Sequence, residues 1–89
     1  MRRFKAGKKL RKTLAKLSKK DPRRYEAVMK KVEELLTCDN PEHYKNLRTP
    51  LQHLKAVHID SHFVLTFRYL RDDNLIELYD FDHHDKIFK

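Results

Sequence analysis

The stretch LKAVHIDSHFVLTFRYLRDDNLIELYDF, residues 54–81, decides the fold, because its apolar side chains recur with a period of two residues. The alternate positions of residues 62–70 form two sets, which are Phe63, Leu65, Phe67 and Tyr69 on one face and His62, Val64, Thr66 and Arg68 on the other. Residues 54–59 alternate in the same way, and RDDN, residues 71–74, is typical of the turn before a last strand, LIELYDF. This pattern predicts an antiparallel meander with one dry face and one wet face.

The residues before this stretch follow a helical period instead. Leu10, Leu14 and Leu17 form one stripe of a helix whose other positions are mostly lysine and arginine. Asp21 is a favourable N-cap and Pro22 suits the first position of a second helix, in which the apolar residues are Tyr25, Val28, Met29, Val32, Leu35 and Leu36. We expect an antiparallel helical hairpin that covers the dry face of the sheet. RRF, residues 2–4, adds at most a short strand, so the expected fold is α+β in a single domain over residues 1–89.

The composition excludes several classes of protein. The chain of 89 residues has one cysteine and one glycine, which rules out an internal disulfide, a thiolate metal cluster and a glycine-rich phosphate loop. FVLTF, residues 63–67, lies in the longest apolar run and is far too short to span a bilayer, and no apolar signal region follows the basic N-terminus. We therefore expect a cytoplasmic protein with no membrane partner.

The charge is unevenly distributed along the chain. Residues 1–36 hold 14 Lys or Arg against 4 Asp or Glu, whereas residues 37–89 hold 7 against 9. Clustered cations gain from binding a polyanion because counterions are released. We expect a nucleic acid or ribosome as the partner, with an acidic protein as an additional or alternative one. The expected docking residues are Lys8, Lys9, Arg11, Lys12 and Lys16.

Histidines of the strands and of the C-terminal stretch FDHHDKIFK, residues 81–89, are the candidate chemical groups. The wet face can gather His58, His62, Thr66 and Arg68, and the stretch after the last strand adds His83 and His84. Cleavage of RNA by internal transesterification needs a proton acceptor, a proton donor and a cation, and imidazoles with an ordinary pKa near ~6.5 can serve in both proton transfers. This scheme requires no metal and no cofactor.

Other interpretations of the same residues stay open. The strand histidines can be ordinary sheet residues, Arg68 can pair with Glu77, Phe63 can belong to the core, and the terminal histidines can form a polar cap. HIDSH and DHHD also supply metal ligands, but His58 and His62 would lie about 13 Å apart on a continuous strand. Only a turn at Asp60–Ser61 would bring them together, and we expect no metal site.

The order of a basic helical hairpin, LRTPLQHLKAVHIDSHFVLTFRY, LIELYDF and HHDKIF resembles the RelE/ParE toxin superfamily, and most of all its YafQ-like branch. The resemblance covers almost the whole chain. It implies an α+β fold with a curved antiparallel sheet and packed helices, and a cognate antitoxin that is small and acidic. It also implies an endoribonuclease that cleaves mRNA bound in the ribosome, with the basic helices against ribosomal RNA.

The resemblance also assigns roles residue by residue. His58 matches a strand position that acts near the scissile phosphate, His62 matches a position where the branch commonly has an aspartate, and His84 or His83 matches a functional histidine after the last strand. Phe63 and Phe88 match aromatic positions. Thr49 stands where the branch can have a histidine, and Asp80 stands near the usual catalytic arginine, so that Arg68 or Lys86 must supply the charge. The expected catalytic residues are His58, His62, His83, His84 and Arg68, and the expected substrate-binding residues are Lys55, Phe63, Lys86 and Phe88.

Two other functions fit the same fold. One is a ParE-like toxin that poisons a protein such as gyrase without catalysis, and the other is an inactive RNA-binding domain. The six histidines of the chain favour the nuclease over the ParE-like toxin.

Overall fold

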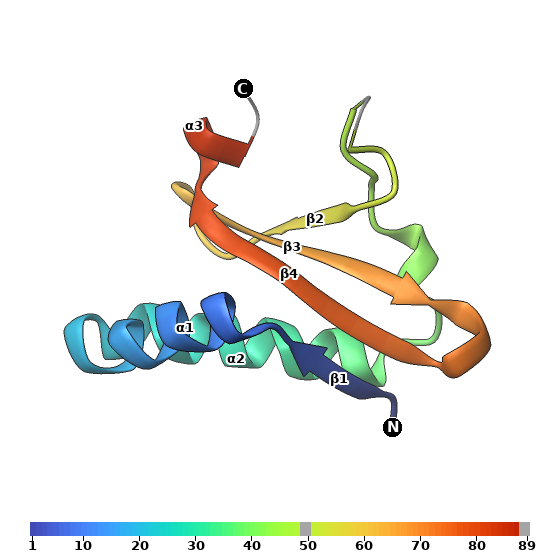
Figure 1. Ribbon diagram of the computed structural model, residues 1–89, viewed down its shortest axis with the longest axis horizontal. Helices are drawn as coiled ribbons and strands as arrows, with labels where there is room; N and C mark the ends of the chain where they lie inside the picture. Colours follow the sequence, from blue (N-terminus) through green and yellow to red (C-terminus); the bar gives the residue numbers. More distant parts are fainter. Residues whose placement is uncertain (49–50, 88–89) are drawn as a thin grey trace.

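The computed structural model describes residues 1–48 and 51–87. Along the chain the elements are β1 (Arg3–Ala6), α1 (Lys8–Lys20), α2 (Pro22–Thr37), the 3-10 turn η1 (Pro41–His43), β2 (Lys55–His58), β3 (Phe63–Leu70), the 3-10 turn η2 (Arg71–Asp73), β4 (Leu75–His83) and α3 (His84–Ile87). The two long helices lie together against one side of the sheet, and α3 lies at the far end of β4 (Figure 1). The α+β prediction is confirmed.

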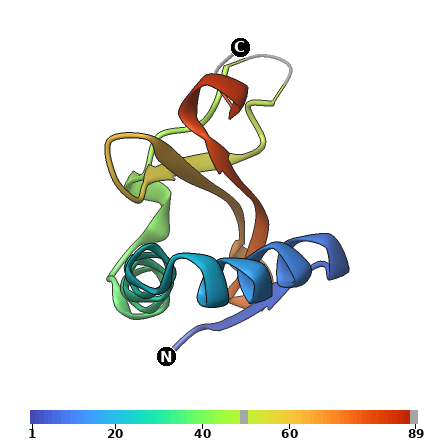
Figure 2. The same cartoon turned by 90° about the vertical axis from the view of Figure 1, so that its left-hand side faces the viewer.

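The helical hairpin begins and turns where the sequence predicts. The Asp21 side chain accepts a hydrogen bond from the Arg24 N–H at 3.2 Å, and Pro22 is the first residue of α2. This N-cap satisfies one of the N–H groups that a helix start leaves without an intrahelical partner. Both helices lie beneath the strands, and α1 crosses α2, which is seen end-on in Figure 2.

The sheet has the strand order β1-β4-β3-β2. The pairs β2–β3 and β3–β4 are antiparallel, as expected for a meander, but β1 runs parallel to β4, with Phe4 opposite Ile76. The sheet is therefore mixed rather than purely antiparallel. A parallel neighbour needs a long connection, and the helical hairpin after β1 is part of it.

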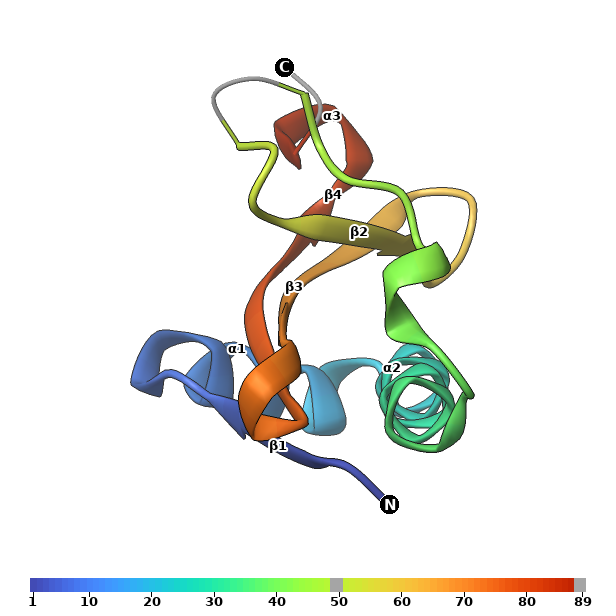
Figure 3. The same ribbon diagram turned by 90° about the vertical axis from the view of Figure 1, so that its right-hand side faces the viewer.

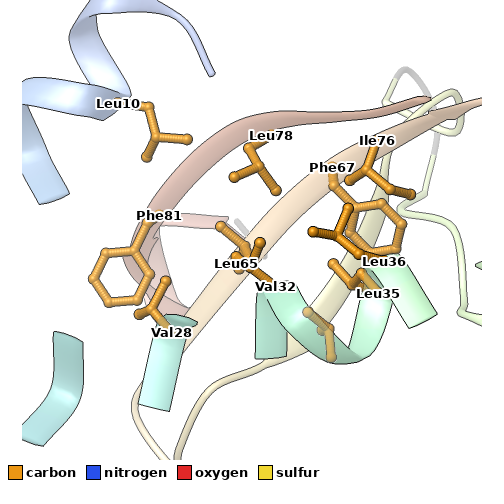
Figure 4. Close-up of a cluster of buried hydrophobic side chains, with 11 residues drawn as sticks. Leu10, Val28, Val32, Leu35, Leu36, Leu65, Phe67, Ile76, Leu78 and Phe81 are labelled. Atoms are coloured by element: carbon orange, nitrogen blue, oxygen red, sulfur yellow. The ribbon is translucent and has the colours of Figure 1, made fainter. Parts of the chain in front are cut away.

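The main core lies between the helices and one face of the sheet. Leu65, Phe67, Leu78 and Phe81 of the strands are almost fully buried together with Leu10 and the apolar stripe of α2, which comprises Val28, Val32, Leu35 and Leu36. Figure 4 shows these side chains meeting between the layers. The alternation of residues 63–67 thus predicts this face correctly.

The opposite face is not the wet surface that the sequence predicts. Leu54, Val64 and Thr66 are at most 2% exposed. Residues 45–47 lie along the outer edge of β2, where Asn46 bridges to Lys55, and the Leu47 N–H donates to the Leu54 carbonyl at 2.9 Å. Thr66 is consequently not a surface residue, and its hydroxyl donates to the Asp80 carbonyl at 3.2 Å.

A β-bulge bends the sheet beside this face. The register of β3 and β4 shifts between Thr66 and Phe67, which pair with Asp80 and Leu78, so Tyr79 lies between two paired residues. Bulges bend a strand and increase its twist. Figure 3 shows the resulting curvature of β3 and β4, and the Tyr79 side chain is left 58% exposed.

Candidate active site

Four histidines gather at one end of the sheet. His58 ends β2, His62 directly precedes β3, His83 ends β4 and His84 begins α3. The ring centroids of His58 and His84 are 6.1 Å apart, and those of His62 and His83 are 6.0 Å apart with an interplanar angle of 21°. The structure therefore brings together the four histidines that the sequence singled out, as two pairs.

The strand register separates the two pairs. His58 is opposite Val64, which is opposite Asp82, whereas His83 is opposite Phe63. Residues directly opposite each other share a face, and neighbours along a strand point to opposite faces. His58 thus lies on the face of Val64 and Thr66, and His83 lies on the helix-covered face. The sequence predicts that all four histidines share one wet face. In the structure they instead form two pairs, one on each side of the end of the sheet.

The pair of His58 and His84 is the more accessible one, since both residues are exposed. The backbone N–H of His84 donates to the His62 carbonyl at 2.7 Å, which fixes the start of α3 against the β2–β3 turn. The His84 Nδ1 atom lies 3.1 Å from Asp85 Oδ1, and the Asp85 N–H donates to His83 Nδ1 at 3.2 Å. A short polar network therefore holds both terminal imidazoles.

Phe63 packs toward the core rather than standing open to a base. It stacks on Phe81 with 5.2 Å between ring centroids, and the Arg24 guanidinium carbon lies 4.2 Å from its ring centre. The edge of the ring also meets His83 at 5.5 Å. A nucleobase would have to displace one of these neighbours before it could stack on the ring. Phe63 is therefore better placed to support His83 than to bind a base.

The candidate cations do not all reach the histidines. Arg68 is five residues beyond Phe63 in β3, roughly 17 Å along the strand. Its partner across the sheet is Glu77, but Glu77 pairs instead with Lys5, at 3.2 Å. The Lys55 ammonium donates to the carbonyls of Glu42 and Tyr44 and to the Asn46 side chain, at 2.9–3.2 Å.

Lys86 is exposed in α3, two residues after His84, and is thus the candidate cation nearest to the histidines in the sequence. Phe88 lies outside the described residues.

Asp60 and Arg24 belong to the site, although the sequence did not single them out. Asp60 Oδ1 accepts from the N–H groups of His62 and Phe63 at 2.8 and 3.0 Å, and Asp60 Oδ2 pairs with Arg24 Nε at 2.9 Å. Burial raises the pKa of Asp60, but the hydrogen bonds from His62, Arg24 and Phe63 outweigh it and hold the pKa below the ordinary value of 3.8. The sequence named a turn at Asp60–Ser61 only as the condition for a metal site, although aspartate followed by serine is by itself a turn signal.

The basic surface lies on α1. Its first turn has no acidic residue, and the lysines and arginines expected to dock are all exposed, namely Lys8, Lys9, Arg11, Lys12 and Lys16. Within residues 1–48 and 51–87, no three His, Cys, Asp or Glu side chains are grouped so as to hold a metal ion. No helix in the same ranges is long and apolar enough to cross a membrane.

Comparison with known proteins gives two close relatives, while no model of a protein family matches the chain. The chain is 50% identical over 80 residues to the candidate toxin RelE4 of Methanocaldococcus jannaschii, which covers 90% of this chain and 83% of the relative. It is 48% identical over 73 residues to an uncharacterized protein of Methanosarcina mazei, covering 82% and 83% of the two chains.

Solved structures of toxins have the same fold. A metal-bound toxin from Helicobacter pylori has a TM-score of 0.77 at 24% identity, over 99% of this chain and 100% of the other. YafQ of E. coli has a TM-score of 0.73 at 17% identity, over the whole of both chains. The toxin–antitoxin complex RelBE2 of Mycobacterium tuberculosis gives 0.69 at 22% identity, over 93% and 98%.

Proposed function

The chain belongs to the RelE family, the toxins of toxin–antitoxin systems, and from this premise we propose that it is a ribosome-dependent endoribonuclease that cleaves mRNA by acid–base catalysis without a metal ion. It acts as a single domain over residues 1–89, in the cytoplasm, where ribosomes and mRNA are found. The observation that carries the proposal is the pair of exposed imidazoles of His58 and His84, 6.1 Å apart at the end of the sheet.

The His58–His84 pair suits the two proton transfers of internal transesterification. One imidazole accepts the proton of the ribose 2′-hydroxyl, and the other donates a proton to the leaving 5′-oxygen. Each needs a hydrogen bond of roughly 2.6–3.2 Å to its oxygen, and two rings 6.1 Å apart can contact the same phosphodiester. Either ring can take either role, and His62 and His83 support them from the other face.

The developing charge on the phosphorus needs a cation. Lys86, exposed in α3, is better suited to this role than Arg68 or Lys55, since Arg68 is five residues along β3 from Phe63 and Lys55 already donates to three oxygens. Asp80 cannot replace an arginine, and its Oδ1 accepts from the Phe81 N–H at 2.8 Å. We therefore expect slower cleavage than an arginine at this position would give.

The partners follow from the charge and from the family. The exposed cations of α1 dock on ribosomal RNA, where they neutralise phosphates. A small acidic antitoxin is the cognate partner, because a chain of net charge +8 attracts an acidic protein and members of the family pair with antitoxins.

Cleavage of mRNA in vitro, with and without ribosomes, tests the proposal. We predict that His84→Ala lowers the rate of ribosome-dependent cleavage by about 10²-fold or more while the fold stays intact, because a proton-transfer group is lost. His53→Ala is the matched control, since His53 is an exposed histidine five residues before His58, in the segment before β2. Full activity of His84→Ala would remove His84 from the site, and equal cleavage of free mRNA would refute ribosome dependence.

A further inference from the structure

Arg24, at the start of α2, links the helical layer to the turn that carries His62. Its guanidinium pairs with Asp21 Oδ2 through Nη1 and with Asp60 Oδ2 through Nε, both at 2.9 Å, and lies over the Phe63 ring at 4.2 Å. Asp21 belongs to the junction of the two helices, whereas Asp60 belongs to the β2–β3 connection and Phe63 is the first residue of β3. The planar fork of arginine suits this use because it can bond two carboxylates and stack on an aromatic ring at once.

The turn held by Arg24 also holds the terminal histidines. Asp60 Oδ1 accepts from the N–H groups of His62 and Phe63, so the carboxylate fixes the backbone of the turn. The His62 carbonyl in turn accepts the His84 N–H at 2.7 Å. The Phe63 ring meets the edge of His83, and the His83 ring stacks with His62. A continuous series of hydrogen bonds, ion pairs and ring contacts therefore runs from Arg24 to both imidazole pairs.

We propose that Arg24 is a positioning residue, which fixes the β2–β3 turn and thereby sets the separations of the His58–His84 and His62–His83 rings. The low pKa of Asp60 supports this arrangement, because the carboxylate stays ionised opposite Arg24 at neutral pH. The effect of the ring separations on cleavage rests on the proposed function. The claim that Arg24 sets these separations holds without it.

The test compares Arg24→Ala with Arg24→Lys and with Arg23→Ala in the full chain. Arg23 is the adjacent residue of the same helix turn and is exposed, so it is a matched control for the loss of one positive charge. The first measurement is the set of nuclear Overhauser effects between imidazole protons of the paired histidines. The second is kcat and KM for ribosome-dependent mRNA cleavage.

We expect Arg24→Ala to weaken the contacts between the rings and to lower kcat by up to about 10²-fold, since misplaced catalytic groups cost that much, with KM nearly unchanged. Arg24→Lys should restore part of kcat, because an ammonium keeps the ion pair with Asp60 but not the stacking on Phe63. Arg23→Ala should keep both the ring contacts and kcat. A purely structural role would not produce this split between kcat and KM.

Wild-type ring contacts and wild-type kcat in a folded Arg24→Ala protein would overturn the proposal. If Arg24→Ala does not fold, Asp60→Ala serves instead, because it removes the turn contacts and leaves the Arg24–Asp21 pair. Unchanged ring contacts in Asp60→Ala would likewise overturn the proposal. If the wild type cleaves no mRNA, the proposed function fails, and the ring contacts alone decide whether Arg24 positions the histidines.

Discussion

His58 and His84 reach one another because of where two strands end. His58 is the last residue of β2, and His84 directly follows the last residue of β4, on the opposite side of β3. A register slip of one residue in either strand would turn the side chains to the other face. Val57 of β2 and Phe81 of β4 are buried and resist such a slip, because each would leave its apolar surroundings. The buried residues of these strands thus help to hold the two imidazoles at their separation.

Tyr44 gives a residue-scale prediction about pH. Its hydroxyl donates to Glu34 Oε1 at 3.0 Å, and burial together with this hydrogen bond raises the pKa of Tyr44 from 10.0 to about 12. The folded state binds this proton more tightly than the unfolded state, so the contribution to stability is present below pH 10.0 and is lost as the pH rises toward 12.

A difference titration of phenolate absorbance between the wild type and Tyr44→Phe measures this group among the four tyrosines. We expect the difference curve to have its midpoint near 12, and a midpoint near 10.0 would contradict the raised pKa of Tyr44 and its hydrogen bond to Glu34. Tyr79→Phe is the control, because the Tyr79 ring is 58% exposed.

At the scale of elements, the sequence predicts correctly those features that depend on residues close together in the chain. The start of α2 follows from Asp21 and Pro22, whose capping roles involve only neighbours in the chain. The core face of β3 follows from the alternation of Phe63, Leu65 and Phe67. The left-handed backbone of Asn74, with φ 49°, likewise fits a turn residue that the sequence placed there.

Long-range pairing explains what the sequence could not predict. Thr66 was expected on a wet face, but the pairing of residues 45–47 along β2 depends on hydrogen bonds between segments that no local pattern specifies. The division of the histidines between two faces likewise depends on the pairing register of β2, β3 and β4. Arg24 was not singled out because its partner Asp60 lies 36 positions further along the chain.

The C-terminal end of α2 gives an element-scale prediction. The last turn of α2 has no basic residue, and Arg2, which directly precedes β1, supplies the missing cation: its guanidinium donates to the carbonyls of Leu36, Cys38 and Asp39. Charged donors at a helix C-terminus satisfy free carbonyls and oppose the helix dipole. Arg2→Ala should therefore lower the free energy of unfolding by about 1–3 kcal/mol in urea titrations.

Arg3→Ala is the matched control for this change, since Arg3 is the next residue and is exposed on β1. Its effect should stay within about 0.5 kcal/mol. Equal losses of stability in the two variants would show that charge alone, rather than capping of α2, is responsible.

In the whole molecule, the basic surface of α1 lies apart from the paired histidines. The basic helix α1 lies along the lower side of the sheet, whereas α3, whose first residue is His84, lies at its upper end (Figure 1). Under the proposed function, α1 and the paired imidazoles contact different stretches of RNA. We therefore predict that substitutions on α1 alter ribosome binding rather than the rate of mRNA cleavage.

Binding of ribosomes at increasing salt tests this separation. Each phosphate contact contributes roughly −0.7 to −0.9 to the slope of log affinity against log salt, so the combined change Lys8→Gln, Arg11→Gln and Lys12→Gln should make the slope shallower by about 2–3 units. Three exposed cations elsewhere, Lys30, Lys45 and Arg71, provide a variant of equal charge when they are changed to glutamine. That variant should keep nearly the wild-type slope, because net charge is lost without phosphate contacts. If both variants shift the slope equally, the attraction arises from net charge and α1 is no specific docking surface; a flat slope in the wild type would leave α1 for the antitoxin instead.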